Sequence, residues 1–101
     1  METRIYKLCS QAEWSAALAA GAYTGSADDV RDGFIHFSTA AQLAATAAKY
    51  FAGRTDLVLV EVDAMRLGTA LRFEPSRGGD LFPHLYGALP LDAVVSSRPY
   101  P

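Results

Sequence analysis

The run Leu57–Val62 (LVLVEV) is the segment that most narrows the choice of fold. It is almost continuously apolar, which is the pattern of a central strand buried on both faces. A chain of 101 residues is large enough for one hydrophobic core and too short for two. We therefore expect a single domain over residues 1–101, built around this strand.

The N-terminal segment predicts a strand followed by a helix. Ile5–Cys9 has strand character, and Ser10 with Glu13 has the S-x-x-E spacing of a capping box. The helix should end near residue 20, because Gly21 is a natural C-terminal stop. Cys9 is the only cysteine, so no disulfide can form within the chain, and we interpret it as a small buried hydrophobic residue.

A loop, a strand and a second helix are expected next. The segment Gly21–Asp32 holds glycine, serine and aspartate and is interpreted as a connecting loop. Phe34–Ser38 predicts a second strand. Thr39 and Gln42 form another capping box for a helix with one apolar stripe, which Gly53 should end.

Strands dominate the remainder of the chain. Leu71–Glu74 and Ala93–Ser97 are predicted strands, and Leu81–Tyr86 is extended. Pro83 should keep Leu81–Tyr86 from being a well-paired central strand, since proline cannot donate to a ladder. Two N-terminal helices followed mostly by strands predict an α+β fold with a small, mostly antiparallel sheet.

Charge and composition limit the kinds of partner that the protein can bind. The net charge is −2 and the nine Lys and Arg residues are scattered, which argues against a nucleic-acid partner. The N-terminus carries charges where a signal peptide would need an apolar run, so we expect a cytoplasmic protein with no membrane association. Two histidines without ligand spacing predict no metal site. We expect a monomer or weak homodimer that takes a small-molecule ligand.

The segment Asp32–Thr39 (DGFIHFST) is the first candidate site. Strand alternation places Phe34, His36 and Ser38 on one face. A helix then begins at Thr39, whose free backbone N–H groups favour an anion. His36 could bind that anion, bond a hydroxyl, or act as acid or base. The alternative is that Ser38 and Thr39 only cap the helix and that His36 is a hydrogen-bonded core residue.

The segment Glu74–Gly87 (EPSRGGDLFPHLYG) is the second candidate site. Arg77 stands beside two glycines and suits a phosphate or carboxylate. His84 and Tyr86 share one face of an extended run, and one polar pocket results if that face meets the face of His36 and Ser38. The alternative is a hairpin loop whose charged groups face water.

The same segments carry a family resemblance. The patterns W-x-x-A-x-x-x-G-x-Y, DGFIHFST, LVLVEVD and EPSRGGDLFPHLYGALPLDAV resemble a widespread bacterial family of unknown function. The chain is more distantly similar to the ADP-ribosyltransferase-like superfamily, in which a His or Arg of the first strand holds the adenosine ribose of NAD. That resemblance implies an ADP-ribosyltransferase-like fold, with Lys7 at the first position and His36 and Ser38 on the second strand. NAD or a related nucleotide is then the candidate cofactor.

The resemblance also marks a departure from the superfamily. Members of the superfamily usually carry a catalytic Glu on a late strand, and the best match to it in this chain is His84. The resemblance therefore implies a nucleotide- or phosphate-binding cleft and not transfer of ADP-ribose by the usual route. The predicted site has His36 and His84 as catalytic groups and Glu74 in support. Its ligand-binding residues are Lys7, Ser38, Thr39, Arg77 and Tyr86.

Two other functions stay open from the sequence. A two-histidine phosphoesterase would use the H-x-[ST] pattern of His36 and Ser38, but the second copy places Tyr86 where Ser or Thr is expected. A non-catalytic structural or interaction module would instead join His36, Glu74, Arg77 and His84 in a buried hydrogen-bonded network.

Overall fold

The computed structural model describes residues 3–101, without the side chain of Arg77. Strand β4 (Leu57–Asp63) lies at the centre of a three-stranded antiparallel sheet, between β1 (Arg4–Ser10) and β8 (Val94–Tyr100). Five of the six residues in the run 57–62 are buried. The predicted central strand is thus confirmed, and the last strand extends three residues beyond its predicted end at Ser97.

A second antiparallel sheet has the order β3-β6-β5. Its strands are β3 (Ile35–His36), β6 (Asp80–Leu85) and β5 (Leu71–Ser76). The predicted strand over 34–38 is shorter than expected, because the Phe37 N–H makes the last bond to β6 and Ser38 then pairs with Tyr6 of β1. A two-stranded sheet joins β2 (Ala22–Tyr23) to β7 (Leu89–Pro90).

The prediction that Pro83 would keep its segment from central pairing is wrong, since β6 is the middle strand. In an antiparallel ladder the N–H and C=O of one residue point toward the same neighbouring strand. The Pro83 carbonyl accepts from the Phe37 N–H at 3.0 Å, on the β3 side. The Pro83 nitrogen, which has no hydrogen to donate, therefore also faces the β3 side, beyond the end of β3. No hydrogen bond between β6 and β5 is lost.

Helices α1 (Gln11–Ala20) and α3 (Ala40–Tyr50) begin at the predicted capping boxes. Gly21 ends α1 with a left-handed conformation, as predicted. The end of α3 comes earlier than Gly53, because Phe51 is already its C-terminal cap. Short 3-10 segments cover Ala64–Ala70, Arg77–Gly79 and Leu91–Ala93.

The interpretation of Gly21–Asp32 as a loop is wrong, because it contains β2 and a third helix, α2 (Ala27–Asp32). Ser26 accepts from the backbone N–H of Asp29, and the Asp29 carboxylate accepts from the backbone N–H of Ser26. This is a capping box with Asp in the place usually taken by Glu or Gln. The fold therefore has three α-helices among residues 3–101 and not two.

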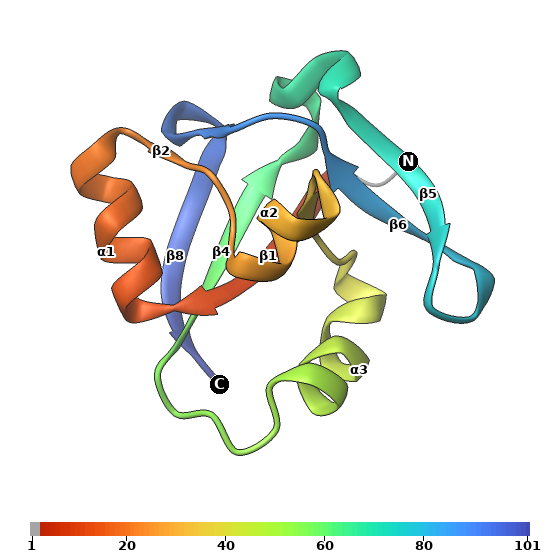
Figure 1. Cartoon of the computed structure of the whole chain (residues 1–101), viewed down its shortest axis with the longest axis horizontal. Coiled ribbons are helices and arrows are strands. Elements are labelled where there is room, and N and C mark those ends of the chain that lie inside the picture. The colour runs from red at the N-terminus through yellow and green to blue at the C-terminus, as the bar shows by residue number, and fades with distance from the viewer. Residues whose placement is uncertain (1–2) are drawn as a thin grey trace.

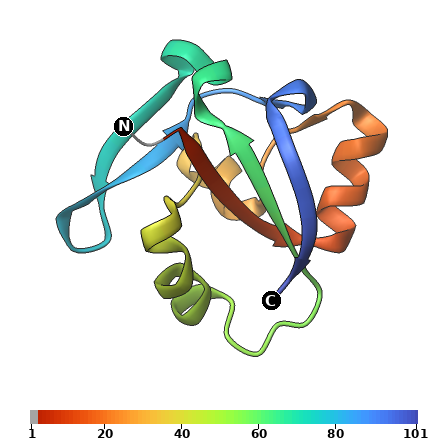
Figure 2. The ribbon, with the colours of Figure 1, turned by 180° about the vertical axis from the view of Figure 1, so that it is seen from behind.

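The helices do not cover both faces of the main sheet equally. In Figure 1, α2 lies in front of β1, while α1 and α3 stand on opposite sides of the molecule. Figure 2 shows β1, β4 and β8 from behind with no helix in front of them. The β5–β6 hairpin projects on the side away from α1 (Figure 1). No helix among residues 3–101 is long and apolar enough to cross a membrane.

The hydrophobic core draws on residues from all three sheets and from α1. It includes Ile5 and Val60 from the main sheet, Trp14 from α1, and Leu85 and Leu89 from the C-terminal half. Cys9 is 1% exposed, and burial raises the pKa of its thiol to about 12. Its interpretation as a buried hydrophobic residue is confirmed.

Candidate functional site

Lys7 is a buried cation at the middle of β1, with only 6% of its surface exposed. Its Nζ lies 2.7 Å from Oδ2 of Asp29 and donates to the backbone carbonyl of His36 at 3.0 Å. An unpaired ammonium at this depth would carry a large desolvation cost. Lys7 therefore links β1 to both α2 and β3 through groups that satisfy its charge.

Asp29 is the hub of this arrangement. Besides Lys7 and the Ser26 N–H, it accepts from the backbone N–H of His36 at 3.1 Å and lies 2.6 Å from His36 Nδ1. Burial by itself would raise the Asp29 pKa, but the hydrogen bonds from His36 and Lys7 and the charge of Lys7 hold that pKa well below its ordinary value. Asp29 is therefore an ionised, buried carboxylate that fixes the orientation of the His36 ring.

His36 stands between two carboxylates. Nδ1 faces Asp29, and Nε2 lies 3.0 Å from Oδ2 of Asp32. Both ring nitrogens donate at once only when the imidazole is protonated. The side chain is 24% exposed, so the Nε2 side can be reached from solvent while the Nδ1 side is closed by Asp29.

A cavity of about 270 Å³ opens beside His36. We call it the His36 pocket. Its charged walls are Lys7, Asp28, Asp29, Arg31 and Asp32, and Ser26, Ser38, Thr46 and Ser76 add hydroxyl groups. Aromatic walls come from Tyr6, Phe37, Tyr50 and Phe51. The pocket is thus mixed in charge, with hydroxyls and aromatic rings around a histidine.

Ser38 and Thr39, both from the first candidate segment, differ in their position relative to the His36 pocket. Ser38 lines the His36 pocket, and its hydroxyl lies 3.0 Å from that of Thr46 in α3. Thr39 does not line the pocket. Its hydroxyl accepts from the Gln42 N–H, and its own N–H donates to the Gln42 side chain. Thr39 is a helix cap in this arrangement, as the alternative interpretation of the sequence had it.

The second candidate segment forms its own cluster. His84 Nδ1 lies 2.8 Å from Oε1 of Glu74, and the Tyr86 hydroxyl donates to the same oxygen at 2.7 Å. The bond from Tyr86, and then that from His84, lowers the Glu74 pKa, while the Glu74 carboxylate raises the Tyr86 pKa. His84 is 4% exposed and its Nε2 has no hydrogen-bond partner.

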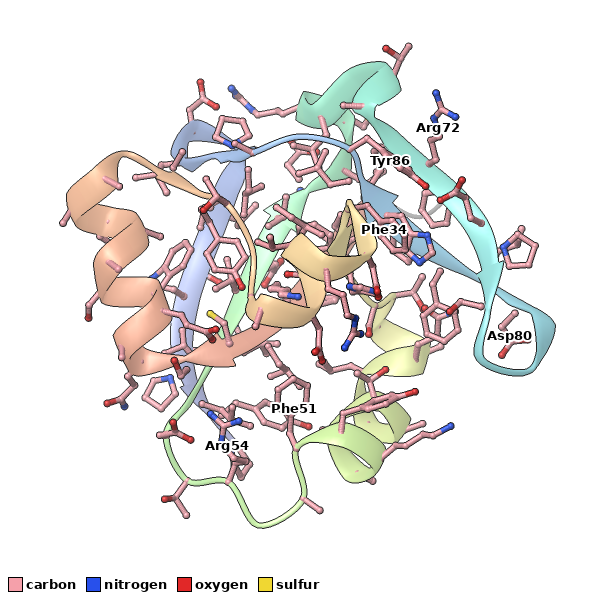
Figure 3. All side chains as sticks on the ribbon, viewed as in Figure 1. Phe34, Phe51, Arg54, Arg72, Asp80 and Tyr86 are labelled. Carbon is pink, nitrogen blue, oxygen red and sulfur yellow. The ribbon has the colours of Figure 1, made fainter. Side chains whose placement is uncertain are left out.

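The two histidines lie side by side without sharing the pocket. His36 pairs with His84 across β3 and β6, and the ring centroids are 5.7 Å apart. The Phe34 ring stacks on His84 at 4.0 Å and lies 5.4 Å from Tyr86, beside which it stands in Figure 3. The predicted faces therefore meet, but His36 lines the pocket whereas His84 is packed beneath Phe34.

The four-residue network suggested by the sequence is not the one present. Glu74 and His84 do bond, but His36 bonds to Asp29 and Asp32 instead. The Arg77 side chain lies outside the described part of the chain. Its neighbour Ser76 lines the His36 pocket, so the tip of the β5–β6 hairpin borders the site.

Asp29 and Asp32 belong to the candidate site, and the sequence did not indicate them. Both belong to α2, which was interpreted as a loop. The usable signal was Ser26-x-x-Asp29, a capping box that would have marked a helix. It would have placed Asp29 and Asp32 one turn apart and therefore on one face.

Comparison with known proteins places the chain in a family. Residues 8–97 match the family described as "Protein of unknown function (DUF952)". The chain belongs to this family. The predicted membership of a family of unknown function is thereby confirmed, while the superfamily resemblance stays a prediction. No curated protein has a significant match.

Solved structures of one bacterial relative share the fold. The crystal structure of protein CC0527 from Caulobacter crescentus is 50% identical and has a TM-score of 0.93, over 96% of this chain and 85% of that chain. A double mutant of CC0527 is 49% identical, with the same TM-score and coverage. The solution NMR structure of CC0527 has a TM-score of 0.84 at 50% identity, over 94% and 82% of the two chains.

Proposed function

We propose that this DUF952 domain binds a nucleotide-like small ligand in the His36 pocket. The observation that carries the proposal is the composition of one cavity. It combines a histidine that is fixed by a buried carboxylate with hydroxyl groups and aromatic rings. Ligand sites commonly pair apolar or aromatic walls with a few fixed polar groups.

The size of the pocket limits the ligand. A volume of about 270 Å³ lies just under the range of roughly 300–1,000 Å³ that is typical for drug-sized ligands. We therefore expect an occupant of about the size of a nucleoside or mononucleotide. A dinucleotide such as NAD would have to extend over the surface, so among the candidate cofactors the smaller nucleotides fit better.

The side chains of the pocket suggest distinct roles. Tyr50 and Phe51 suit stacking against a base, and the Ser38 hydroxyl suits hydrogen bonding to a ribose hydroxyl. Lys7 already faces Asp29 at 2.7 Å, so we assign it to holding Asp29 and the His36 carbonyl in place. The ligand-binding role that the sequence predicted for Lys7 is therefore assigned to Arg31 and His36.

The proposal concerns binding, and it assigns no reaction. A base oriented by a carboxylate is a common arrangement in general acid–base catalysis, and His36 with Asp29 has that form. However, His36 Nε2 faces Asp32, so it is not available to a substrate proton in this arrangement. The second histidine of a phosphoesterase is not available either, because His84 is buried and bonded to Glu74.

NMR titration of the isotope-labelled protein with adenosine 5′-monophosphate (AMP) tests the proposal. We expect shifts of the backbone amides of Tyr6, His36 and Ser38 in a saturating, dose-dependent manner. The amides of Val95 and Ser97, on the edge strand β8, serve as the internal control and should not move. The absence of shifts in the pocket at millimolar AMP, adenosine or ribose 5-phosphate would rule the proposal out.

A further inference from the structure

Asp32 holds the solvent-facing side of His36. It is the last residue of α2, its Oδ2 lies 3.0 Å from His36 Nε2, and its Oδ1 lies 3.0 Å from Nε of Arg31. Its side chain is 33% exposed, against 1% for Asp29 on the other side of the ring. His36 is thus flanked by one buried carboxylate and one that reaches water.

The position of Asp32 is intrinsically poor for an anion. The C-terminal end of a helix carries partial negative charge from its unpaired carbonyl groups. The helix therefore does not favour the Asp32 carboxylate, which is held by His36 and Arg31 instead. Arg31 is largely exposed and also contacts Asp28, and exposed pairs of this kind contribute little. Asp32 is therefore the more exchangeable of the two carboxylates.

The groups that hold Asp32 would hold a phosphate. The Arg31 guanidinium offers charge-assisted N–H donors that suit phosphate oxygens, and an imidazole N–H can donate to the same anion. Lys7 and Asp29 neutralise each other in the wall behind them. When the Asp32 carboxylate turns toward water, the Arg31 guanidinium and Nε2 of His36 face the His36 pocket.

We propose that the Asp32 carboxylate occupies the phosphate position of the His36 pocket, and that the phosphate monoester of a ligand displaces it. This inference rests on the proposed function and specifies the ligand as one that bears a terminal phosphate. The displaced carboxylate moves into solvent, while the phosphate contacts His36 Nε2 and the Arg31 guanidinium. Asp32 acts as an internal competitor that lowers the apparent affinity for anions.

Replacing Asp32 should change the affinity for a ligand that bears a phosphate and not the affinity for one that lacks it. In D32N the side chain keeps its shape but loses the charge that repels an incoming phosphate. We expect AMP to bind D32N about tenfold more tightly than wild type, since like charges at one position oppose each other strongly. Adenosine, which lacks the phosphate, should bind both proteins with similar affinity.

Isothermal titration calorimetry with AMP and adenosine provides the measurement. D56N is the matched control, because Asp56 is also an exposed aspartate paired with a nearby arginine, Arg54, but does not line the pocket. It removes the same single charge and should leave the AMP affinity within twofold. Arg31→Gln should weaken AMP binding about tenfold and leave adenosine binding unchanged, because adenosine has no phosphate for Arg31 to contact.

The outcomes separate this inference from the proposed function. Tighter AMP binding to D32N alone, with adenosine unaffected, supports the displacement. If AMP and adenosine both bind wild type but D32N gains nothing for AMP, the displacement is wrong while the pocket remains a ligand site. If neither compound binds either protein, both the displacement and the proposed function are wrong. Thermal unfolding of each variant confirms that it is folded before titration.

Discussion

At the scale of single residues, Asp29 decides how the site is held together. It contacts Lys7 of β1, the Ser26 N–H before α2 and two groups of His36 in β3. A carboxylate that is 2% exposed would ordinarily neutralise by taking up a proton. Here its donors keep it ionised, so the fold and the orientation of His36 depend on the same charge.

The first prediction is that Asp29→Asn destabilises the protein by about 3–5 kcal/mol at pH 7, the cost of leaving a buried ion unpaired. The affected ion is Lys7, whose Nζ loses its carboxylate. The folded-state pKa of Asp29 is depressed, so its stabilising contribution is complete above the unfolded pKa of about 3.9. It is lost as the pH falls through and below that value.

Urea unfolding of wild type and D29N between pH 7 and pH 3 checks both parts of this prediction. The gap in unfolding free energy should be largest near neutral pH and should narrow below about pH 4. Asp28→Asn is the control, because this neighbouring aspartate is 74% exposed and should leave the urea midpoint unchanged. A gap that stays constant over the whole pH range would show that the loss has another origin than the charge of Asp29.

At the scale of elements, α2 links the fold to the site. It has only six residues, which is too short for a helix to be stable on its own. Its capping box and its contacts with β1 and β3 therefore have to hold it. Because Asp29 and Asp32 are one turn apart on this helix, they lie on one face and reach opposite nitrogens of His36.

The second prediction concerns Gly25, which precedes this capping box with φ of +108°. A Cβ built there would lie 2.7 Å from the Cβ of Asp29, so Gly25→Ala should displace Asp29 as well as strain the backbone. Gly21→Ala is the control, since Gly21 also has positive φ (+89°) but meets no atom within 4 Å. We expect about 1–2 kcal/mol of destabilisation for G21A and a clearly larger loss for G25A.

Chemical denaturation with NMR spectra of both variants tests that difference. Only G25A should also shift the His36 backbone amide, because its N–H donates to Asp29. The prediction is wrong if G25A and G21A lose the same unfolding free energy and the His36 amide of G25A does not shift. The loop would then accommodate the new methyl group without moving Asp29.

The sequence predicted those elements that carry strong local signals. The apolar run of β4 and the capping boxes of α1 and α3 are such signals, and all three elements formed. Helix α2 was missed because six residues are too few to show periodicity. The central place of β6 was missed because the effect of Pro83 depends on which neighbour its nitrogen faces, and this is a tertiary property.

The site was predictable only in part, for the same reason. Strand alternation and the resemblance brought Lys7, His36 and Ser38 to one place, and all three line one pocket. The carboxylates that flank His36 lie four and seven residues before it, on a helix that folds back over β3. No pattern local to DGFIHFST could indicate which acidic residue reaches which nitrogen.

At the scale of the whole molecule, the His36 pocket joins parts of the chain that are distant in sequence. Its walls come from β1, α2, β3, α3 and the residue Ser76 at the end of β5. A ligand that contacts several of these walls binds the folded state and has no comparable site in the unfolded chain. Ligand binding should therefore stabilise the entire domain.

The third prediction is that AMP raises the melting temperature. At a concentration 100 times its dissociation constant, a ligand adds about 2.7 kcal/mol to the stability of the folded state. For a domain of this size, each kcal/mol corresponds to a shift of roughly 4–8 °C, so we expect an increase of about 10–20 °C at that saturation. Differential scanning calorimetry at several AMP concentrations measures the shift.

The control for this experiment is sodium sulfate at matched ionic strength, which separates binding from general salt effects. The AMP shift should grow with the logarithm of concentration once the pocket is saturated, because each further tenfold increase adds about 1.4 kcal/mol. A shift of the same size in sulfate would indicate salt stabilisation or an anion site without selectivity. A melting temperature that does not respond to AMP, in a protein that NMR shows to bind it, would require the unfolded chain to bind AMP equally well. The polar groups gathered around His36 exist only in the fold, so we expect the logarithmic increase.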